Sequence, residues 1–274
     1  MCSRLRQLAV IALLAGITVA CRQQPVTTEP DPDFWHTANV ESTEQIDHTA
    51  WQQLLSAAVA DVADDVNLVD YAAFAGQHKA ALDSYIASLA AIDPRRYAHD
   101  EQMAYWINLY NALTVQRVAR DWPVTSILNV GSLTRQGPWD EPLVRVAGML
   151  LSLNDIEHGI LRRVWDEPRI HFAVNCASVG CPDLSVDAYR GSELDAQLQT
   201  AARSYLASER GVAWRDETLQ LSAIFEWYAD DFGASESAVI KHLAALADTQ
   251  TRDRLLSHDG DVVYDYDWSI NARH

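Results

Sequence analysis

Apolar side chains recur every three or four residues along much of the chain, the spacing that places them on one face of an α-helix. Two of these stretches end at Asp93-Pro94 and Trp122-Pro123, and a helix usually ends before a proline. The pattern predicts helices over residues 51–62, 79–92, 100–121, 152–164, 192–206, 223–232, 235–246 and 251–256.

Shorter stretches predict strands. Residues 143–152 and 212–221 each hold two apolar runs around a short turn and predict hairpins, residues 68–71 form an extended piece, and residues 262–268 alternate as a strand does. Residues 170–176 also alternate, so we expect a core strand with Cys176 on one face and His171 and Asn175 on the other. The fold class expected is α+β: a helix-rich single domain over residues 48–274, with a small mixed or antiparallel sheet and no internal repeat.

The predicted strand ends in Cys176-Ala177-Ser178-Val179-Gly180-Cys181-Pro182, where glycine and proline predict a tight loop. Chemistry in α/β and α+β domains often lies at the carboxyl ends of core strands. We therefore take Cys176 as a candidate nucleophile. The alternative is that Cys176 is a small buried hydrophobic residue, as free cysteines often are.

The helix over 100–121 is apolar on nearly every side, which predicts a central, buried helix. Asn108 and Asn111 lie three residues apart on one of its faces, so both amides should point into the interior. A buried amide without hydrogen bonds costs about 1–3 kcal/mol. The two amides therefore either bracket a neighbouring loop or orient groups at the Cys176 site.

The amino terminus has the pattern of a targeting segment. Arg4 and Arg6 precede an apolar run over residues 8–14, and Ala20 lies before Cys21. This resembles a bacterial lipoprotein signal, with residues 1–20 as the signal peptide and Cys21 as the lipidation (palmitate) site, although an ordinary cleaved signal is the alternative. Residues 21–47 are rich in proline and threonine and predict a lipid anchor and flexible tether.

From this signal we expect a bacterial cell-envelope location, with the protein anchored through lipid on Cys21, facing the periplasm at the outer membrane. The net charge of −17 becomes −19 without residues 1–20, which hold two arginines and no acid. Such a chain repels nucleic acid, so the membrane contact through lipid and a small-molecule, peptide or protein partner are the partners that we expect.

Export also changes how many cysteines the folded domain retains. Cys2 leaves with the signal and Cys21 is acylated, so the folded domain keeps Cys176 and Cys181 in an oxidising compartment. A disulfide across this C-x4-C loop is therefore a possible bond.

Five stretches resemble the domain-of-unknown-function 547 family, and together they span most of residues 68–271. The resemblance implies no activity, because the family is named for having none assigned, and it transfers no catalytic residue. The stretches are residues 105–112 (YWINLYNA), 153–162 (LNDIEHGILR), 169–182 (RIHFAVNCASVGCP), 225–232 (FEWYADDF) and 267–271 (DWSIN).

The chain lacks the glycine-rich nucleotide-binding motifs, the serine-hydrolase elbow G-x-S-x-G and the metalloprotease motif H-E-x-x-H. We therefore expect no cofactor. A cysteine nucleophile needs a base and a group that orients it, and His158 with Glu157 on the preceding helix fits this better than His171, which faces away from Cys176 on the predicted strand.

Four functions follow from these residues. The first is a cysteine-dependent hydrolase or acyltransferase with catalytic Cys176, His158, Glu157, Asn108 and Asn111, and with His171, Asn175, Ser178 and Cys181 as binding residues. The second is a non-catalytic binding or scaffold domain with a structural Cys176–Cys181 disulfide. The third is a thiol–disulfide redox module that uses the same two cysteines. The fourth, a zinc site of His158, His171, Cys176 and Cys181, conflicts with the expected orientation of His171.

Overall fold

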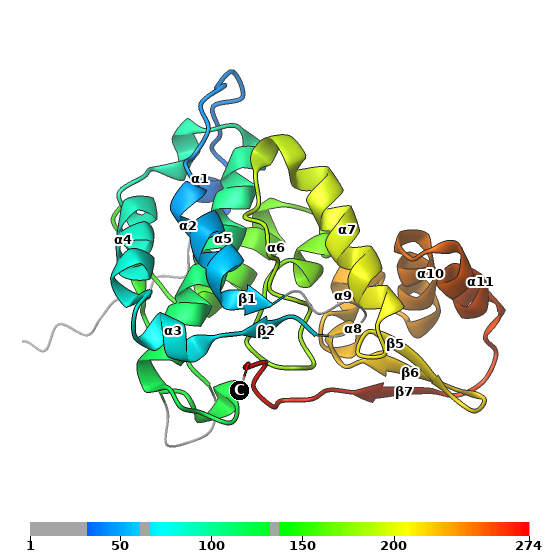
Figure 1. Cartoon of the computed structure of the whole chain (residues 1–274). Coiled ribbons are helices and arrows are strands. Elements are labelled where there is room, and N and C mark those ends of the chain that lie inside the picture. The colour runs from blue at the N-terminus through cyan, green and yellow to red at the C-terminus, as the bar shows by residue number, and fades with distance from the viewer. Residues whose placement is uncertain (1–31, 61–65, 132–136, 274) are drawn as a thin grey trace, which may run out of the picture.

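The computed structural model describes residues 32–60, 66–131 and 137–273 (Figure 1). The predicted signal peptide over residues 1–20, the lipidation site Cys21 and the first part of the predicted tether lie outside the described residues. Within them, no helix combines the length and the apolar character that crossing a membrane requires.

The fold class predicted from the sequence is confirmed, because the structure is 52% helical and its sheets have two or three strands. Helices are present at the predicted places, but two predictions need correction: the helix predicted over 51–62 ends at Ala58 and the chain continues as strand at residues 59–60, and the one over 223–232 is interrupted at Tyr228 and forms two short helices. The helices are α1 (Pro32–Trp35), α2 (Thr49–Ala58), α3 (Tyr71–Ala75), α4 (Lys79–Ala90), α5 (His99–Asp121), α6 (Arg162–Val164), α7 (Leu194–Ala207), α8 (Ile224–Trp227), α9 (Ala229–Phe232), α10 (Glu236–Leu246) and α11 (Thr249–Ser257).

The strands of the described residues form three small sheets. Two are antiparallel pairs, and the third is mixed: β5 pairs antiparallel with β6, and β6 pairs parallel with β7, with Leu221 opposite Tyr264. The strands are β1 (Val59–Ala60), β2 (Leu68–Val69), β3 (Val144–Val146), β4 (Met149–Leu151), β5 (Val212–Arg215), β6 (Thr218–Ser222) and β7 (Val262–Asp265).

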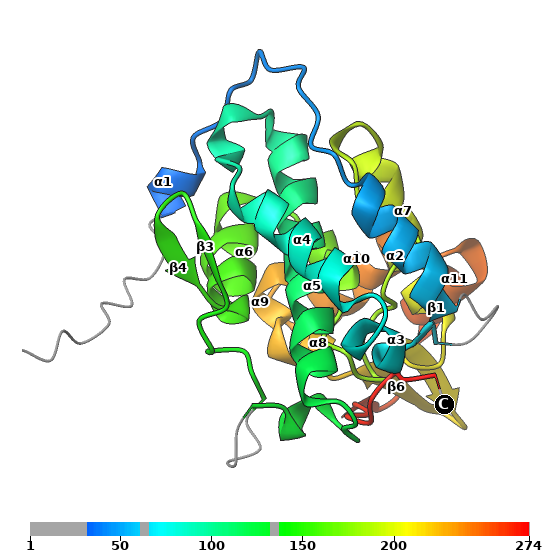
Figure 2. The same ribbon diagram turned by 60° about the vertical axis from the view of Figure 1, so that its left-hand side comes forward.

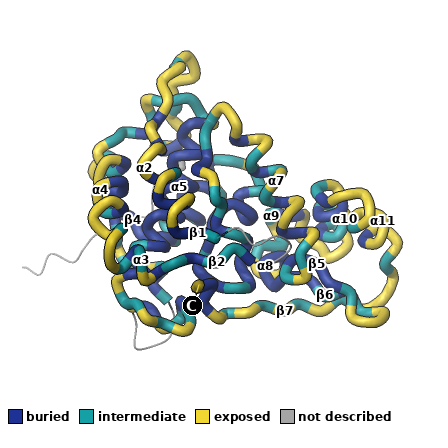
Figure 3. Tube along the Cα trace, in the orientation of Figure 1, coloured by how far each residue is buried: buried dark blue, intermediate teal, exposed yellow. Residues whose placement is uncertain are grey.

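Helix α5 runs through the middle of the molecule and contacts both α3 and α4 (Figure 2). Its side chains are buried on almost every side, as the apolar pattern predicts, and Trp106 and Leu109 are fully buried. Burial is concentrated along this helix, whereas α4, α10 and α11 expose much of their surface (Figure 3). A second apolar cluster, centred on Phe225 and Phe232, packs α7 and α10 against the mixed sheet. The segment with the two cysteines lies between these two clusters.

The described part of the stretch predicted as tether, residues 32–47, contributes to the core. Trp35 at the end of α1 is fully buried and packs edge-on against Trp106, with ring centroids 4.9 Å apart. Ile46 is also buried, and its N–H donates to Glu101 Oε1 at 2.6 Å. Packed structure therefore begins before residue 48. Burying the large aromatic side chain of Trp35 is favourable enough to order this segment despite the prolines near it.

The predicted core strand over residues 170–176 is wrong. Residues Pro168–Phe172 form a 3₁₀ helix, and an irregular segment follows. Glu167 accepts a hydrogen bond from the Arg169 N–H and Pro168 occupies the first helical position, a local signal for a helix start. The alternation of side chains does not reflect two faces, because residues 170–175 are all buried.

Candidate functional site

The segment that carries the cysteines is held from one side by the central helix. Asn111 Nδ2 donates to the Ala173 carbonyl at 2.9 Å, and its Oδ1 accepts from the Asn175 N–H at 2.8 Å. Asn108, one turn earlier, brackets a different segment in the same way: it donates to the Tyr189 carbonyl at 2.8 Å and accepts from the Tyr189 N–H at 3.0 Å. Both amides therefore bracket loops, and only Asn111 lies against the cysteine segment.

Asn175 fixes the turn between the two cysteines. Its side chain accepts from the Ala177 N–H at 2.9 Å and donates to the Pro182 carbonyl at 2.7 Å, so it links both ends of the turn. Ala177 has a φ of 63°, a left-handed conformation that is unfavourable for alanine and persists only where the surroundings impose it. The side chain of Asn175 is thus a structural brace, and it does not line the cavity described below.

The C-terminal tail braces the same turn from another side. The Val179 N–H donates to the Ser269 carbonyl and the Gly180 N–H to the Asp267 carbonyl, both at 2.8 Å. A Cβ at Gly180 would lie 2.7 Å from the Asp267 backbone nitrogen, so only glycine allows this close approach. The conformation of the cysteine turn therefore depends on residues about 90 positions later in the chain.

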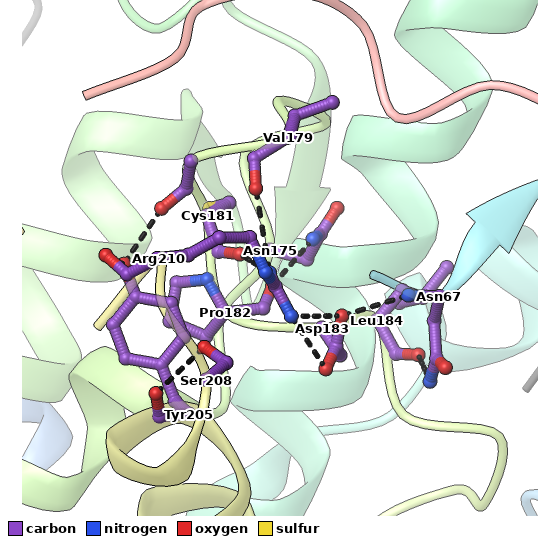
Figure 4. Close-up of polar contacts among 11 residues, drawn as sticks. Asn67, Asn175, Val179, Cys181, Pro182, Asp183, Leu184, Tyr205, Ser208 and Arg210 are labelled. Atoms are coloured by element: carbon purple, nitrogen blue, oxygen red, sulfur yellow. Dashed lines mark hydrogen bonds and ion pairs between the residues drawn. The ribbon is translucent and has the colours of Figure 1, made fainter. Parts of the chain in front are cut away.

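Arg210 clamps the turn from outside (Figure 4). Its Nη1 donates to the Cys181 carbonyl at 2.6 Å and to the Val179 carbonyl at 3.3 Å. Its Nη2 donates to both Asp183 carboxylate oxygens at 3.0 and 3.1 Å, and Asp183 Oδ1 also accepts from the Asn67 N–H at 2.9 Å. These bonds satisfy carbonyl groups of the turn and tie it to the segment before β2.

The two cysteines are free thiols in contact with each other. Their Sγ atoms are 2.6 Å apart, longer than the 2.03–2.05 Å of a disulfide bond. Cys181 is buried, with 3% of its surface exposed, whereas Cys176 is half-buried. Cys176 Sγ also lies 2.9 Å from the Tyr266 hydroxyl and 3.2 Å from the Ser178 hydroxyl, and these two oxygens are 2.7 Å apart.

The surroundings shift the pKa values of the two thiols in opposite directions. Hydrogen bonds from Cys181, Ser178 and Tyr266 lower the pKa of the Cys176 thiol, although burial and the charge of Glu157 oppose this shift. Burial, together with the nearby Cys176 sulfur, raises the pKa of the Cys181 thiol well above its usual value. Cys176 is therefore the thiol that ionises first, and it is also the more exposed one.

Cys176 lies in the wall of a cavity of about 200 Å³. Six of the lining residues are tyrosine or tryptophan, and one, Glu157, is acidic. The lining residues are Tyr110, Trp139, Asn154, Glu157, His158, His171, Val174, Cys176, Cys181, Pro182, Ile224, Trp227, Tyr228, Tyr266 and Trp268.

Glu157 and His158 reach the cavity from the π-helix Asp155–Leu161. The predicted capping box begins this helix: the Ser152 N–H donates to Asp155 Oδ2 at 2.8 Å, and the Asp155 N–H donates to Ser152 Oγ at 3.1 Å. The wider π turn, in which the Arg162 N–H donates to the Glu157 carbonyl, is a geometry that is frequent at functional sites.

Glu157 is buried, with 6% of its surface exposed, and its charge raises the pKa values of the Tyr110 and Tyr228 hydroxyls in addition to the larger effect of burial. Its nearest basic group is His158 Nδ1, 3.9 Å from Oε1. Burial lowers the pKa of His158, so the imidazole is neutral at pH 7. Its Nδ1 also lies 3.4 Å from Arg162 Nη1.

His171 lines the same cavity as Cys176, so the predicted placement of these residues on opposite faces is wrong. The reason is the helical turn over residues 168–172, which changes the direction of the side chain. His171 Nε2 lies 2.6 Å from Asp231 Oδ2, and the ring stacks on Tyr228 with centroids 4.2 Å apart. Arg162 donates two hydrogen bonds to the same Asp231 carboxylate, at 2.6 and 2.9 Å.

The structure thus brings seven of the predicted site residues to one place: Cys176, Cys181, His158, His171 and Glu157 line the cavity, while Ser178 and Asn111 contact the cysteine segment. Asn108 lies elsewhere. In the described ranges, no group of three or more histidine, cysteine, aspartate or glutamate side chains is arranged to hold a metal ion.

Sequence reasoning missed several residues of this site. Tyr266 was assigned only to a strand, and Asp231 and Arg210 were given no role. Tyr266 and Asp231 lie next to or in stretches that carry the family resemblance, and this resemblance is the signal that could have identified them. Nothing in the local pattern distinguishes Arg210 from a surface arginine. The aromatic residues of the cavity wall come from four separate segments.

Comparison with known proteins supports one relationship. The model of the family described as "Protein of unknown function, DUF547" matches residues 94–206, which include α5, the π-helix and the cysteine segment. No curated protein and no solved structure matches the chain.

Proposed function

We propose that this chain, whose residues 94–206 match the DUF547 family, is a thiol–disulfide exchange protein in which Cys176 attacks and Cys181 resolves. The observation that carries this proposal is the contact between two free thiols with opposite properties. Cys176 lies in a cavity wall with a lowered pKa, whereas Cys181, 2.6 Å away, is buried with a raised pKa. Exchange requires an accessible thiolate and a second thiol within bonding reach.

In the forward step, the Cys176 thiolate attacks one sulfur of a substrate disulfide, forming a Cys176–substrate mixed disulfide and releasing the other half as a thiolate. Cys181 then loses its proton to a thiolate of the substrate and attacks Cys176 Sγ. The products are the Cys176–Cys181 disulfide, one substrate thiol and one substrate thiolate, which takes up from solvent the proton that Cys176 lost on ionising, so the substrate gains the two electrons that the protein dithiol loses. The Cys176 N–H, 2.9 Å from Cys181 Sγ, stabilises the second thiolate as it forms.

A cysteine-dependent hydrolase or acyltransferase is the second candidate, because Glu157 and His158 line the same cavity as Cys176. Against it stand the partners of the thiol. In the described part of the chain, Cys176 Sγ contacts Cys181, Ser178 and Tyr266, and neither His158 nor His171 hydrogen-bonds to it. A thiol nucleophile of this class depends on an imidazole within hydrogen-bond reach.

The exchange function is tested by titrating the exported domain, without Cys21, against a series of thiol–disulfide buffers. We expect both thiols to disappear in a single two-electron step that dithiothreitol reverses in the native protein, as read by alkylation and mass spectrometry. Oxidation by small disulfides should start at Cys176 because it is the exposed, lower-pKa thiol. A bond that opens only after unfolding would contradict the proposal and favour a structural disulfide.

We also propose that the protein is an exported lipoprotein of the bacterial envelope. The support is the pattern of Arg4, Arg6, the apolar run over residues 8–14 and Ala20-Cys21. If lipid is attached at Cys21, Cys21→Ser should move the protein from the membrane fraction to the soluble exported fraction and abolish incorporation of labelled palmitate, because one residue carries all the acyl chains. Cys2→Ser, which changes a residue of the signal itself, is the matched control. Unchanged fractionation of Cys21→Ser would refute the anchor.

A further inference from the structure

We infer that the cavity beside Cys176 binds a small ligand that carries an ammonium group, held by the aromatic walls and by Glu157. If Cys176 exchanges with disulfides, we expect its substrates to be disulfides that carry an ammonium group, and this part of the inference rests on the proposed function. As a statement about binding, the inference stands independently of exchange.

The walls of the cavity offer several ring faces close together. Trp227 and Trp268 are stacked with centroids 5.5 Å apart, and Tyr266 lies 4.9 Å from Trp227 and 4.6 Å from Trp268. Trp139 packs edge-on to Trp268 at 6.0 Å. Trp227 is 46% exposed, which is unusual for so large an apolar side chain. Clustered ring faces attract cations, and tryptophan does so most strongly.

The charged side chains in the described part of the cavity wall favour a cation. Glu157 is buried there, and among the described residues no lysine or arginine lines the cavity. The guanidinium of Arg162, which lies 3.4 Å from the lining residue His158, is engaged by two hydrogen bonds to Asp231 and lies over the Tyr228 ring at 4.9 Å. A cationic ligand would therefore meet a carboxylate that no lysine or arginine of the described wall pairs with, whereas a carboxylate or phosphate ligand would meet repulsion from Glu157 and only the two histidines as basic groups.

The size of the cavity limits the ligand. About 200 Å³ is less than the roughly 300–1,000 Å³ of sites for drug-sized molecules. It suits a methylated or primary ammonium on a short chain. Glu157 and Cys176 line the same cavity, so the ammonium and the reacting sulfur of one short molecule can occupy the site together, and the charge of Glu157 opposes ionisation of the thiol. A cation bound at Glu157 would also relieve this opposition.

Binding is tested first, without exchange. Tetramethylammonium should quench the tryptophan fluorescence of the reduced protein in a saturable manner. Neopentyl alcohol, a neutral molecule of similar shape, and acetate, an anion, should not. Glu157→Gln should weaken tetramethylammonium binding about tenfold, as should Trp227→Leu, which removes an exposed ring face. Glu226→Gln removes an acid at the exposed surface of the neighbouring α8 and serves as the matched control. If Glu157→Gln does not fold, as judged by circular dichroism, Trp227→Leu keeps the test decisive.

Exchange is tested with three symmetrical disulfides of similar size: cystamine (cationic), bis(2-hydroxyethyl) disulfide (neutral) and dithiodiglycolate (anionic). We expect the second-order rate with Cys176 to fall about tenfold at each step in that order, after correction for rates with free glutathione, and the order to be lost in Glu157→Gln. Absence of both tetramethylammonium binding and a charge preference overturns the inference. Tetramethylammonium binding without reaction of any disulfide supports the binding site and overturns the proposed exchange function instead.

Discussion

Replacing Cys176 by serine should lower the rate of disulfide exchange by at least about 100-fold and leave the fold intact. The hydroxyl has the shape of the thiol and keeps the contacts with Ser178 and Tyr266, but it is hardly ionised at neutral pH and is a far poorer nucleophile. Cys181→Ser should have a different effect: Cys176 still attacks, no thiol resolves the adduct, and a mixed disulfide with the substrate accumulates. Intact-mass spectrometry after reaction with cystamine measures both outcomes.

The same pair of variants separates the alternatives. A hydrolase that uses Cys176 would lose activity in Cys176→Ser and keep most of it in Cys181→Ser, with no adduct. A structural disulfide would make the two variants equally less stable, by at most about 2–3 kcal/mol for so short a loop in the chain-entropy model. Equal losses of stability, with no mixed disulfide in Cys181→Ser, would be incompatible with exchange.

The helical part of the fold was predictable because its signals are local. The stripe of apolar residues and the proline at Pro123 define α5, and the exchange of hydrogen bonds between Ser152 and Asp155 begins the π-helix at the predicted position. These features depend on residues within one or two turns of each other, and so does the two-residue turn between β3 and β4.

The strand predicted over residues 170–176 shows where such signals end. Alternation of large and small side chains indicates a strand only if one face is less buried than the other, and here both are buried between two apolar clusters. A stronger signal is local: Glu167-Pro168 just before this stretch is a typical helix start.

The cavity was predictable only in part. Cys176, Cys181 and the residues of the π-helix were accessible from their chemistry and spacing. Tyr266 and Trp268 reach the site because the C-terminal tail crosses the cysteine turn, with the Gly180 N–H bonded to the Asp267 carbonyl. Contacts across about 90 residues leave no periodic trace in the sequence, and the same is true of the bonds from Arg210 to the turn.

Replacing either of the two buried amides of α5 should strongly lower the stability of the protein. Asn111→Ala leaves the Ala173 carbonyl and the Asn175 N–H without partners in a buried place, and Asn108→Ala does the same to both groups of Tyr189. Each variant should therefore lose about 2–4 kcal/mol of unfolding free energy, measured by urea denaturation, because each unpaired group costs about 1–3 kcal/mol.

The two variants should differ in the reactivity of the thiol, because only Asn111 holds the segment that leads into Cys176. In Asn111→Ala we expect the rate of alkylation of Cys176 by iodoacetamide, followed from pH 6 to 10, to change at least about threefold, since the hydrogen bonds from Cys181, Ser178 and Tyr266 that lower its pKa depend on the position of this segment. Asn108→Ala, matched in helix, burial and bond count, should leave the alkylation profile unchanged. If alanine prevents folding, Asn111→Asp and Asn108→Asp, which keep the acceptor and remove the donor, repeat the comparison. Equal shifts of the profile in both variants would show that α5 affects Cys176 only through overall stability.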